Sequence, residues 1–126
     1  MTDVARLLLV DDEPDLLDVL EEYFSGRYAV TTAISGAVAV ERFIKQRPDA
    51  VFLDVNMPGV SGLHVLRLFR EADPGVPIIM MTANDLVSVA EDCLKHGAFA
   101  YVPKPFKLAY MDHIAAIAVA QRRPKV

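Results

Sequence analysis

The sequence predicts an α/β protein built on a doubly wound, five-stranded parallel sheet. The first observation is that short apolar runs alternate with longer helical patterns along the whole of the 126 residues. The second is that the central runs, such as Leu7-Leu8-Leu9-Val10, are apolar throughout, which is typical of strands covered on both faces. Strict alternation of strand and helix gives right-handed crossovers, parallel strands and helices on both sides of the sheet.

Each predicted element follows from a run of residues and the punctuation around it. The predicted strands are Arg6–Val10, Tyr28–Ala33, Ala50–Leu53, Pro77–Met81 and Phe99–Val102. The predicted helices are Pro14–Ser25, Gly36–Gln46, Gly62–Glu71, Asp85–His96 and a last one from Phe106 to about Arg122. Ser35 and Asn84 are predicted N-caps, and Gly97 is predicted to end the fourth helix. The second strand is more polar than the central ones, which suits a sheet edge, so we expect the flavodoxin-like (βα)5 order 2-1-3-4-5.

Length and composition place the chain among ordinary globular proteins. We expect one domain over residues 1–126, in which residues 122–126 form a solvated tail or the start of a linker. The net charge of −4 gives no bulk attraction to nucleic acid or anionic lipid, so neither is expected as a direct partner. Cys93 is the only cysteine, which excludes an intrachain disulfide, and we expect it in the core. No run reaches the length of a membrane span, and we expect a cytoplasmic protein.

Polar residues end the strands that should line one crevice of this sheet. Asp11 and Asp12 follow the first strand, Asp54 the third, Thr82 the fourth and Lys104 the fifth. The carboxyl ends of parallel strands lie at one edge, and ligands bind there at the switch point between the first and third strands. We therefore expect three carboxylates, one hydroxyl and one ammonium to converge.

Such a cluster has an electrostatic problem that a cation would solve. At ~4 Å, each pair of carboxylates repels by roughly 4 kcal/mol at an effective dielectric constant of 20, and Lys104 alone cannot neutralise three acids. Either one carboxylate takes up a proton or a cation enters, and all-oxygen ligands favour Mg²⁺. Asp54 is the lone acid at the end of a central strand and is the candidate nucleophile for phosphoryl transfer.

At these residues the chain resembles the receiver domain of bacterial two-component response regulators, which are CheY-like. The resemblance covers the whole chain and rests on Asp11-Asp12, Asp54 followed by Met57-Pro58-Gly59 and Gly62, Thr82-Ala83, and Lys104-Pro105. It implies that the chain is a phosphorylated signalling switch and not an enzyme with turnover. Its only catalysis would be its own phosphoryl transfer and slow autodephosphorylation.

The resemblance also implies a role for each site residue. A histidine kinase or a phosphotransfer protein would phosphorylate Asp54 in a phosphorelay. Mg²⁺ would be bound directly by Asp12, Asp54 and the backbone carbonyl of Asn56, and by Asp11 through water. Asn56 and Asn84 occupy the positions that bear on the lifetime of the phosphorylated form.

The remaining implied roles concern the response to phosphate. Thr82 and Lys104 would contact the phosphoryl group, and Tyr101 matches the switch aromatic of the family. The Lys104–Pro105 bond would be cis. Phosphorylation would change the face formed by the fourth helix, the fifth strand and the last helix, through which a downstream effector protein or domain, or a homodimer partner, would bind.

Structural explanations exist for each of these residues. The acidic pair could cap a helix, and Asp54 could simply form a turn before Pro58-Gly59. The charges at the other strand ends, including Lys104 between two prolines, favour the functional interpretation. Thr82 could be a plain N-cap, and without the family pattern this interpretation and contact with phosphate are about equally supported. Tyr101 could be an aromatic residue that only packs within its strand.

Two rival functions use the same residue types. A haloacid-dehalogenase-like phosphatase combines an Asp nucleophile, a Thr or Ser and a Lys with Mg²⁺, but it carries a second acid two residues after the nucleophile. Here Asn56 stands at that position, and the candidate nucleophile follows the third strand instead of the first. A degenerate receiver used only for docking would not require the intact set of acids, hydroxyl and lysine.

The last helix leaves a further question open. From Leu108 to Ala120 its only charged residue is Asp112, and apolar residues occupy more of its circumference than one buried stripe requires. One interpretation is a tightly packed alanine-rich helix. The other is an outer face that joins Tyr101 and the fourth helix in a partner or dimer surface.

Overall fold

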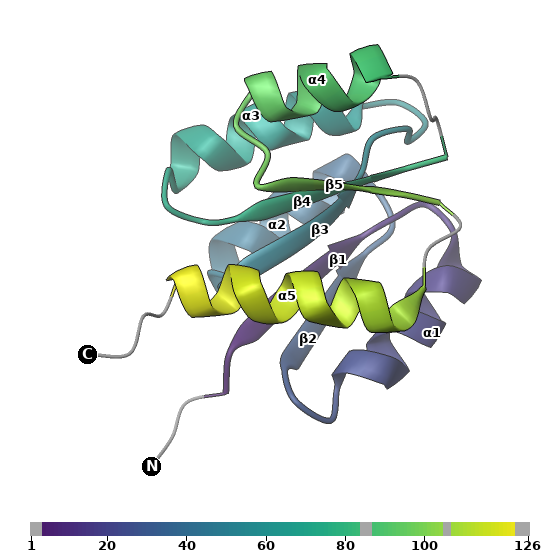
Figure 1. The fold of residues 1–126 in the computed structure, drawn as a ribbon, viewed down its shortest axis with the longest axis vertical. Coiled ribbons are helices and arrows are strands. Elements are labelled where there is room, and N and C mark those ends of the chain that lie inside the picture. Colours follow the sequence, from purple (N-terminus) through teal and green to yellow (C-terminus); the bar gives the residue numbers. More distant parts are fainter. Residues whose placement is uncertain (1–3, 84–86, 105–106, 123–126) are drawn as a thin grey trace.

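The computed structural model describes residues 4–83, 87–104 and 107–122, which form alternating strands and helices (Figure 1). The strands are β1 (Arg6–Val10), β2 (Ala29–Ala33), β3 (Ala50–Asp54), β4 (Ile78–Thr82) and β5 (Ala100–Pro103). The helices are α1 (Pro14–Phe24), α2 (Gly36–Gln46), α3 (Gly62–Ala72), α4 (Val87–Lys95) and α5 (Leu108–Arg122).

The strands form one parallel sheet in the order β2-β1-β3-β4-β5, which confirms the predicted topology. Because successive side chains of a strand point to opposite faces, β1 contributes side chains to two hydrophobic cores, one on each face of the sheet. Leu7 and Leu9 pack with residues of α1 and α5, whereas Leu8 and Val10 pack with residues of α2, α3 and α4. Cys93 of α4 is fully buried in the second of these cores, as predicted.

Most predicted boundaries agree with the structure to within two residues, and the differences at the carboxyl ends of strands matter for function. Asp54 and Thr82 were predicted to follow their strands but are the last residues of β3 and β4. Asp54 is paired in register with Met81, and the N–H of Lys104 donates to the Thr82 carbonyl at 2.6 Å. The backbone of both residues is therefore held by the sheet.

The predicted helix signals are present where the chain is described. The Ser35 hydroxyl accepts a hydrogen bond from the Val38 N–H at 3.2 Å, as an N-cap does. Gly97 has a φ of +100° just after α4, a conformation that glycine adopts without strain. The predicted N-cap Asn84 and the predicted cis Lys104–Pro105 bond lie outside the described residues.

Two ion pairs fasten α5 to the rest of the molecule. Arg27, in the turn before β2, lies 2.5 Å from Asp112 of α5 and stacks over the rings of Tyr23 and Tyr28. At the end of α5, both guanidinium nitrogens Nη1 and Nη2 of Arg122 contact the Asp73 carboxylate. Arg122, at the border of the expected tail, is thus helical and ion-paired.

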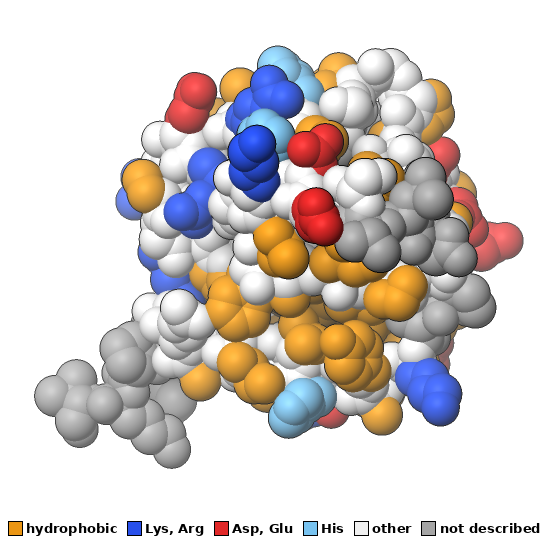
Figure 2. Space-filling model, turned by 45° about the horizontal axis from the view of Figure 1, so that its top comes forward, with side chains coloured by type: hydrophobic (Ala, Val, Ile, Leu, Met, Phe, Trp, Pro, Cys, Tyr) orange, Lys and Arg blue, Asp and Glu red, His pale blue; other side chains and the backbone are white. Residues whose placement is uncertain are grey.

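The outer surface of α5 carries apolar side chains. Tyr110 and Ile117 are 47% and 45% exposed, and Leu94 of α4 is 51% exposed. Figure 2 shows hydrophobic side chains gathered on this side of the molecule, in the lower half of the view. Among the described helices, none combines the length and apolar character needed to cross a bilayer.

Candidate functional site

The structure brings the three predicted acids together at the carboxyl edge of the sheet, which confirms their convergence. Carboxylate oxygens of Asp11, Asp12 and Asp54 all lie within 4.8 Å of one another. Asp11 and Asp54 are buried, whereas Asp12 is accessible to solvent. These three residues are called the acidic cluster below.

Backbone hydrogen bonds fix the first acid of the cluster. The Asp11 N–H donates to the Ala33 carbonyl at 3.1 Å, which extends the pairing of β1 with β2 by one step. The Asp11 side chain in turn accepts from the Glu13 N–H at 3.0 Å, at the entrance to α1. Asp11 is therefore held at both its backbone and its carboxylate.

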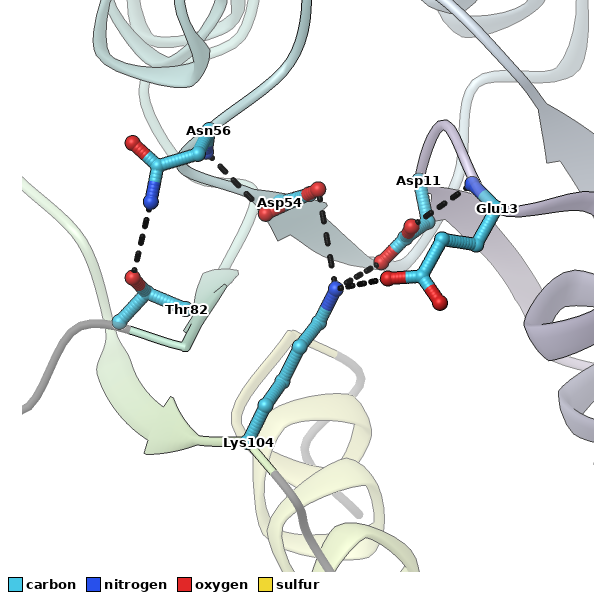
Figure 3. Close-up of polar contacts among 6 residues, drawn as sticks. All are labelled: Asp11, Glu13, Asp54, Asn56, Thr82 and Lys104. Atoms are coloured by element: carbon cyan, nitrogen blue, oxygen red, sulfur yellow. Dashed lines mark hydrogen bonds and ion pairs between the residues drawn. The ribbon is translucent and has the colours of Figure 1, made fainter.

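Lys104 reaches the acidic cluster from the end of β5 (Figure 3). Its Nζ lies 2.6 Å from Asp11 Oδ2, 3.5 Å from Glu13 Oε1 and 3.7 Å from Asp54 Oδ2. The strong partner of the ammonium is thus Asp11, and Asp54 is a more distant one. Burial lowers the pKa of Lys104, but the hydrogen bond to Asp11 and the charges of the surrounding carboxylates raise it by more. The pKa is therefore above its ordinary value, and Lys104 carries a fixed positive charge.

Asp54 is the most perturbed acid of the site. Its pKa is raised to about 6, first by burial and then by the negative charge of Asp11, with a smaller contribution from Asp12. A hydrogen bond from the Asn56 N–H at 3.1 Å and the charge of Lys104 act in the opposite direction. One lysine leaves the negative charge of the cluster incompletely compensated, as the sequence predicted.

Thr82 lies on the other side of Asp54 from Lys104 (Figure 3). Its side chain is fully buried at the end of β4. Its hydroxyl oxygen accepts a hydrogen bond from the side-chain amide of Asn56 at 3.3 Å. Asp54 is thus flanked by an ammonium on one side and a hydroxyl on the other.

Tyr101 is placed away from the acids, on β5 opposite Met80 of β4. It is half-buried and packs against the core cluster that contains Cys93 of α4. Tyr101 therefore packs on the face of the sheet that is covered by α4.

The donor set of the acidic cluster fits a hard divalent cation. The three carboxylates supply only oxygen atoms, and Mg²⁺ is bound in proteins by one or two carboxylates with water completing its shell. Burial and the negative charge of Asp11 both raise the pKa of Asp54, and a bound cation would offset both effects. Solvent access at Asp12 leaves room for coordinated water.

Two contacts of the site were not predicted from the sequence. Glu13 Oε1 lies 3.5 Å from Lys104 Nζ, although no role was predicted for Glu13. The side-chain amide of Asn56 reaches Thr82, whereas only its backbone carbonyl had been assigned a contact. The acidic run Asp11-Asp12-Glu13 was a signal for the first, but no sequence pattern indicates the second.

The fold and the site define a class: a doubly wound α/β domain with an acidic cluster and a lysine at the carboxyl edge of its sheet. Residues 7–116 match the family described as response regulator receiver domain. The chain belongs to the receiver domain family of response regulators, the phosphoacceptor modules of two-component signalling systems.

Individual relatives agree with this assignment. The chain is 41% identical to the probable transcriptional regulatory protein TcrX of Mycobacterium tuberculosis, over 82% of this chain and 45% of that protein. It is 40% identical to the response regulator MprA of Mycobacterium leprae, over 95% of this chain and 52% of that protein. The chain thus spans about half the length of these relatives.

A solved structure gives the same picture for the fold. A response regulator receiver domain protein from Clostridium thermocellum superimposes with a TM-score of 0.89 at 26% identity. The match covers 94% of this chain and 97% of that one.

Proposed function

We propose that Asp54 accepts a phosphoryl group from the phosphohistidine of a histidine kinase or a phosphotransfer protein, in a Mg²⁺-dependent reaction in the cytoplasm. The observation that carries this proposal is the surroundings of Asp54, which lies between the Lys104 ammonium and the Thr82 hydroxyl within an acidic cluster. An acid with a pKa of about 6 is mostly ionised near neutral pH and is thus a competent nucleophile.

In the transfer, a carboxylate oxygen of Asp54 forms a bond to phosphorus while the bond from phosphorus to the donor imidazole breaks, and its electron pair returns to the imidazole. Such a reaction needs in-line positioning and compensation of charge on the transferring oxygens. Lys104 supplies one positive charge and Thr82 one hydrogen-bond donor. Bound Mg²⁺, held by Asp12, Asp54 and the Asn56 carbonyl, with Asp11 acting through water, would supply the remaining positive charge.

The same arrangement supports a switch. Lys104 Nζ is 2.6 Å from Asp11 but 3.7 Å from Asp54, so a phosphoryl group on Asp54 would attract the ammonium away from its present partner. It would also attract the Thr82 hydroxyl. Thr82 of β4 is in register with Pro103 of β5, two residues after Tyr101, so a shift at the site can reach this ring.

The output surface of this switch would be the face formed by α4, β5 and α5. Support comes from the exposed apolar side chains Leu94, Tyr110 and Ile117 on these helices. Such a surface suits a downstream effector protein or domain, or a second copy of the chain. The chain would thus act by contact with a partner, and the loss of its phosphoryl group to water would reset it.

Intact mass measurement tests the assignment of Asp54. The protein is incubated with Mg²⁺ and a small acyl-phosphate donor, and we expect an adduct of about 80 Da, the mass of one phosphoryl group. Asp54→Asn removes the nucleophile and should give no adduct. Asp49→Asn is a matched control, because Asp49 is also a buried acid but lies before the opposite end of β3, so its adduct should persist. An equal adduct on Asp54→Asn would assign phosphorylation to another residue.

A further inference from the structure

Asn56 connects the candidate phosphoacceptor, through its backbone, with the candidate phosphate sensor, through its side chain. Its backbone N–H donates to Asp54 Oδ1 at 3.1 Å, and its side-chain Nδ2 donates to Thr82 Oγ1 at 3.3 Å (Figure 3). The second contact spans 26 residues of sequence between Asn56 and Thr82. One residue therefore bridges the ends of two neighbouring strands, β3 and β4.

The direction of the second hydrogen bond has a chemical consequence. A threonine hydroxyl has one proton to donate and two lone pairs that accept. Because the Asn56 amide donates to the oxygen, it occupies a lone pair, and the hydroxyl proton must point away from the amide. A donated hydrogen bond also polarises the O–H group, which makes it a better donor to a further acceptor.

The backbone around Asn56 is held firmly enough to aim this amide. The Gly62 N–H donates to the Val55 carbonyl at 2.9 Å, which closes the loop between β3 and α3. The approach is so close that a Cβ on Gly62 would overlap the Asp54 carbonyl oxygen. The segment from Asp54 to Asn56 is thus fixed on one side by the sheet and on the other by the start of α3.

We propose that Asn56 is a positioning residue for phosphoryl recognition: its side-chain amide orients the Thr82 hydroxyl for donation to a phosphoryl oxygen on Asp54. This role is separate from any contact of Asn56 with metal through its backbone carbonyl. It acts entirely through Thr82, and it rests on the proposed function of Asp54. It follows that removing the amide has no effect on recognition when the hydroxyl is already absent.

A double-mutant cycle tests this dependence. The four proteins are the wild type, Asn56→Ala, Thr82→Val, which removes the hydroxyl while keeping the shape, and the double variant. The readout is the affinity for beryllium fluoride, which mimics a phosphoryl group, in the presence of Mg²⁺. Binding is followed by NMR chemical shifts. We expect Asn56→Ala to weaken binding about threefold to tenfold when Thr82 is present, since one hydrogen bond is lost, and less than about twofold in the Thr82→Val background.

The control variant is Val60→Ala, which truncates an exposed side chain of the same loop and should leave the affinity unchanged in both backgrounds. Equal losses from Asn56→Ala in the two backgrounds would show that Asn56 acts independently of Thr82 and would overturn the inference. So would an unchanged affinity of Asn56→Ala, provided that the wild type forms the acyl-phosphate adduct. Absence of that adduct in the wild type would instead remove the proposed function and this inference together.

Discussion

At the scale of single residues, the site is built on an unfavourable placement of Asp54. Its carboxylate is buried beside Asp11, and both effects raise its pKa. The sheet fixes the backbone of Asp54 in this position, because Asp54 is the last paired residue of β3. A carboxylate whose ionised form is destabilised by burial is stabilised by a bound cation, and its conversion to an acyl phosphate removes the buried carboxylate charge.

This placement predicts a pH dependence of stability in the absence of divalent cations. The pKa of Asp54 rises from 3.8 to about 6 on folding, so the folded state binds more protons in this interval and the free energy of unfolding falls as pH increases through it. About two pKa units correspond to about 3 kcal/mol as an upper bound. Relative to the wild type, Asp54→Asn should therefore gain stability between about pH 4 and about pH 7.

Urea unfolding of both proteins across this range, with a chelator present, measures the difference. If the difference in free energy of unfolding between the two proteins does not vary with pH, folding does not raise the pKa of Asp54. Addition of Mg²⁺ at neutral pH should stabilise the wild type and leave Asp54→Asn nearly unchanged, because a ligand that binds only the folded state raises its stability.

The sequence predicted which residues meet at the site, because the carboxyl ends of parallel strands all lie at the same edge of the sheet. It could not predict their individual partners. The preference of Lys104 for Asp11 over Asp54, and the reach of Glu13 to Lys104, depend on side-chain distances of a few ångströms. Such distances are decided by packing of the whole rim and leave no trace in spacing or composition.

At the scale of elements, the predictions succeeded where a local signal exists. Ser35 caps α2 and Gly97 ends α4, as their residue types indicated. The ends of β3 and β4 were placed one residue early, because a polar residue was taken as the end of an apolar strand. A strand ends where its neighbour ceases to offer hydrogen bonds, and that neighbour is chosen by topology.

The loop between β3 and α3 gives a prediction at this scale. Gly62→Ala would place a Cβ against the backbone of Asp54 and Val55, and we expect it to cost about 1–3 kcal/mol in free energy of unfolding. Because the strain falls on Asp54 itself, the rate of adduct formation should also decrease. Gly26→Ala is the control, since nothing lies within 4 Å of its added Cβ, and it should change stability by less than about 0.5 kcal/mol.

Chemical denaturation and the intact-mass assay together decide between two outcomes. Loss of stability with an unchanged rate of adduct formation would mean that the loop only supports α3. A reduced rate in Gly62→Ala, with Gly26→Ala like the wild type, would link the loop to the geometry of Asp54.

At the scale of the whole molecule, the acidic cluster lies at the carboxyl edge of the sheet, whereas exposed apolar side chains lie on α4 and α5. The open question left by the last helix is partly answered. Met111, Ala115 and Ala118 are fully buried against the sheet, and Asp112 is paired with Arg27, yet Tyr110 and Ile117 remain exposed. The helix is therefore packed on one side and apolar on the other.

A charged substitution on this outer side tests the proposed dimer surface. We expect Ile117→Glu to lower the average mass of the phosphorylated protein toward that of the monomer, measured by light scattering after size-exclusion chromatography. The matched control is Ile44→Glu, an equally drastic change at a side chain that is 64% exposed on α2, across the sheet from α5. If both variants associate as the wild type does, this face serves another partner or none.

The order of the strands has a consequence for the time at which the protein acquires its chemistry. Residues of the site come from position 11 to position 104, and Lys104 follows the last strand. A growing polypeptide on the ribosome, or a fragment that lacks β5, would carry its aspartates without their fixed ammonium. The set of site residues is thus complete only once β5 has joined the sheet, so the phosphorylation proposed for Asp54 should require all five strands.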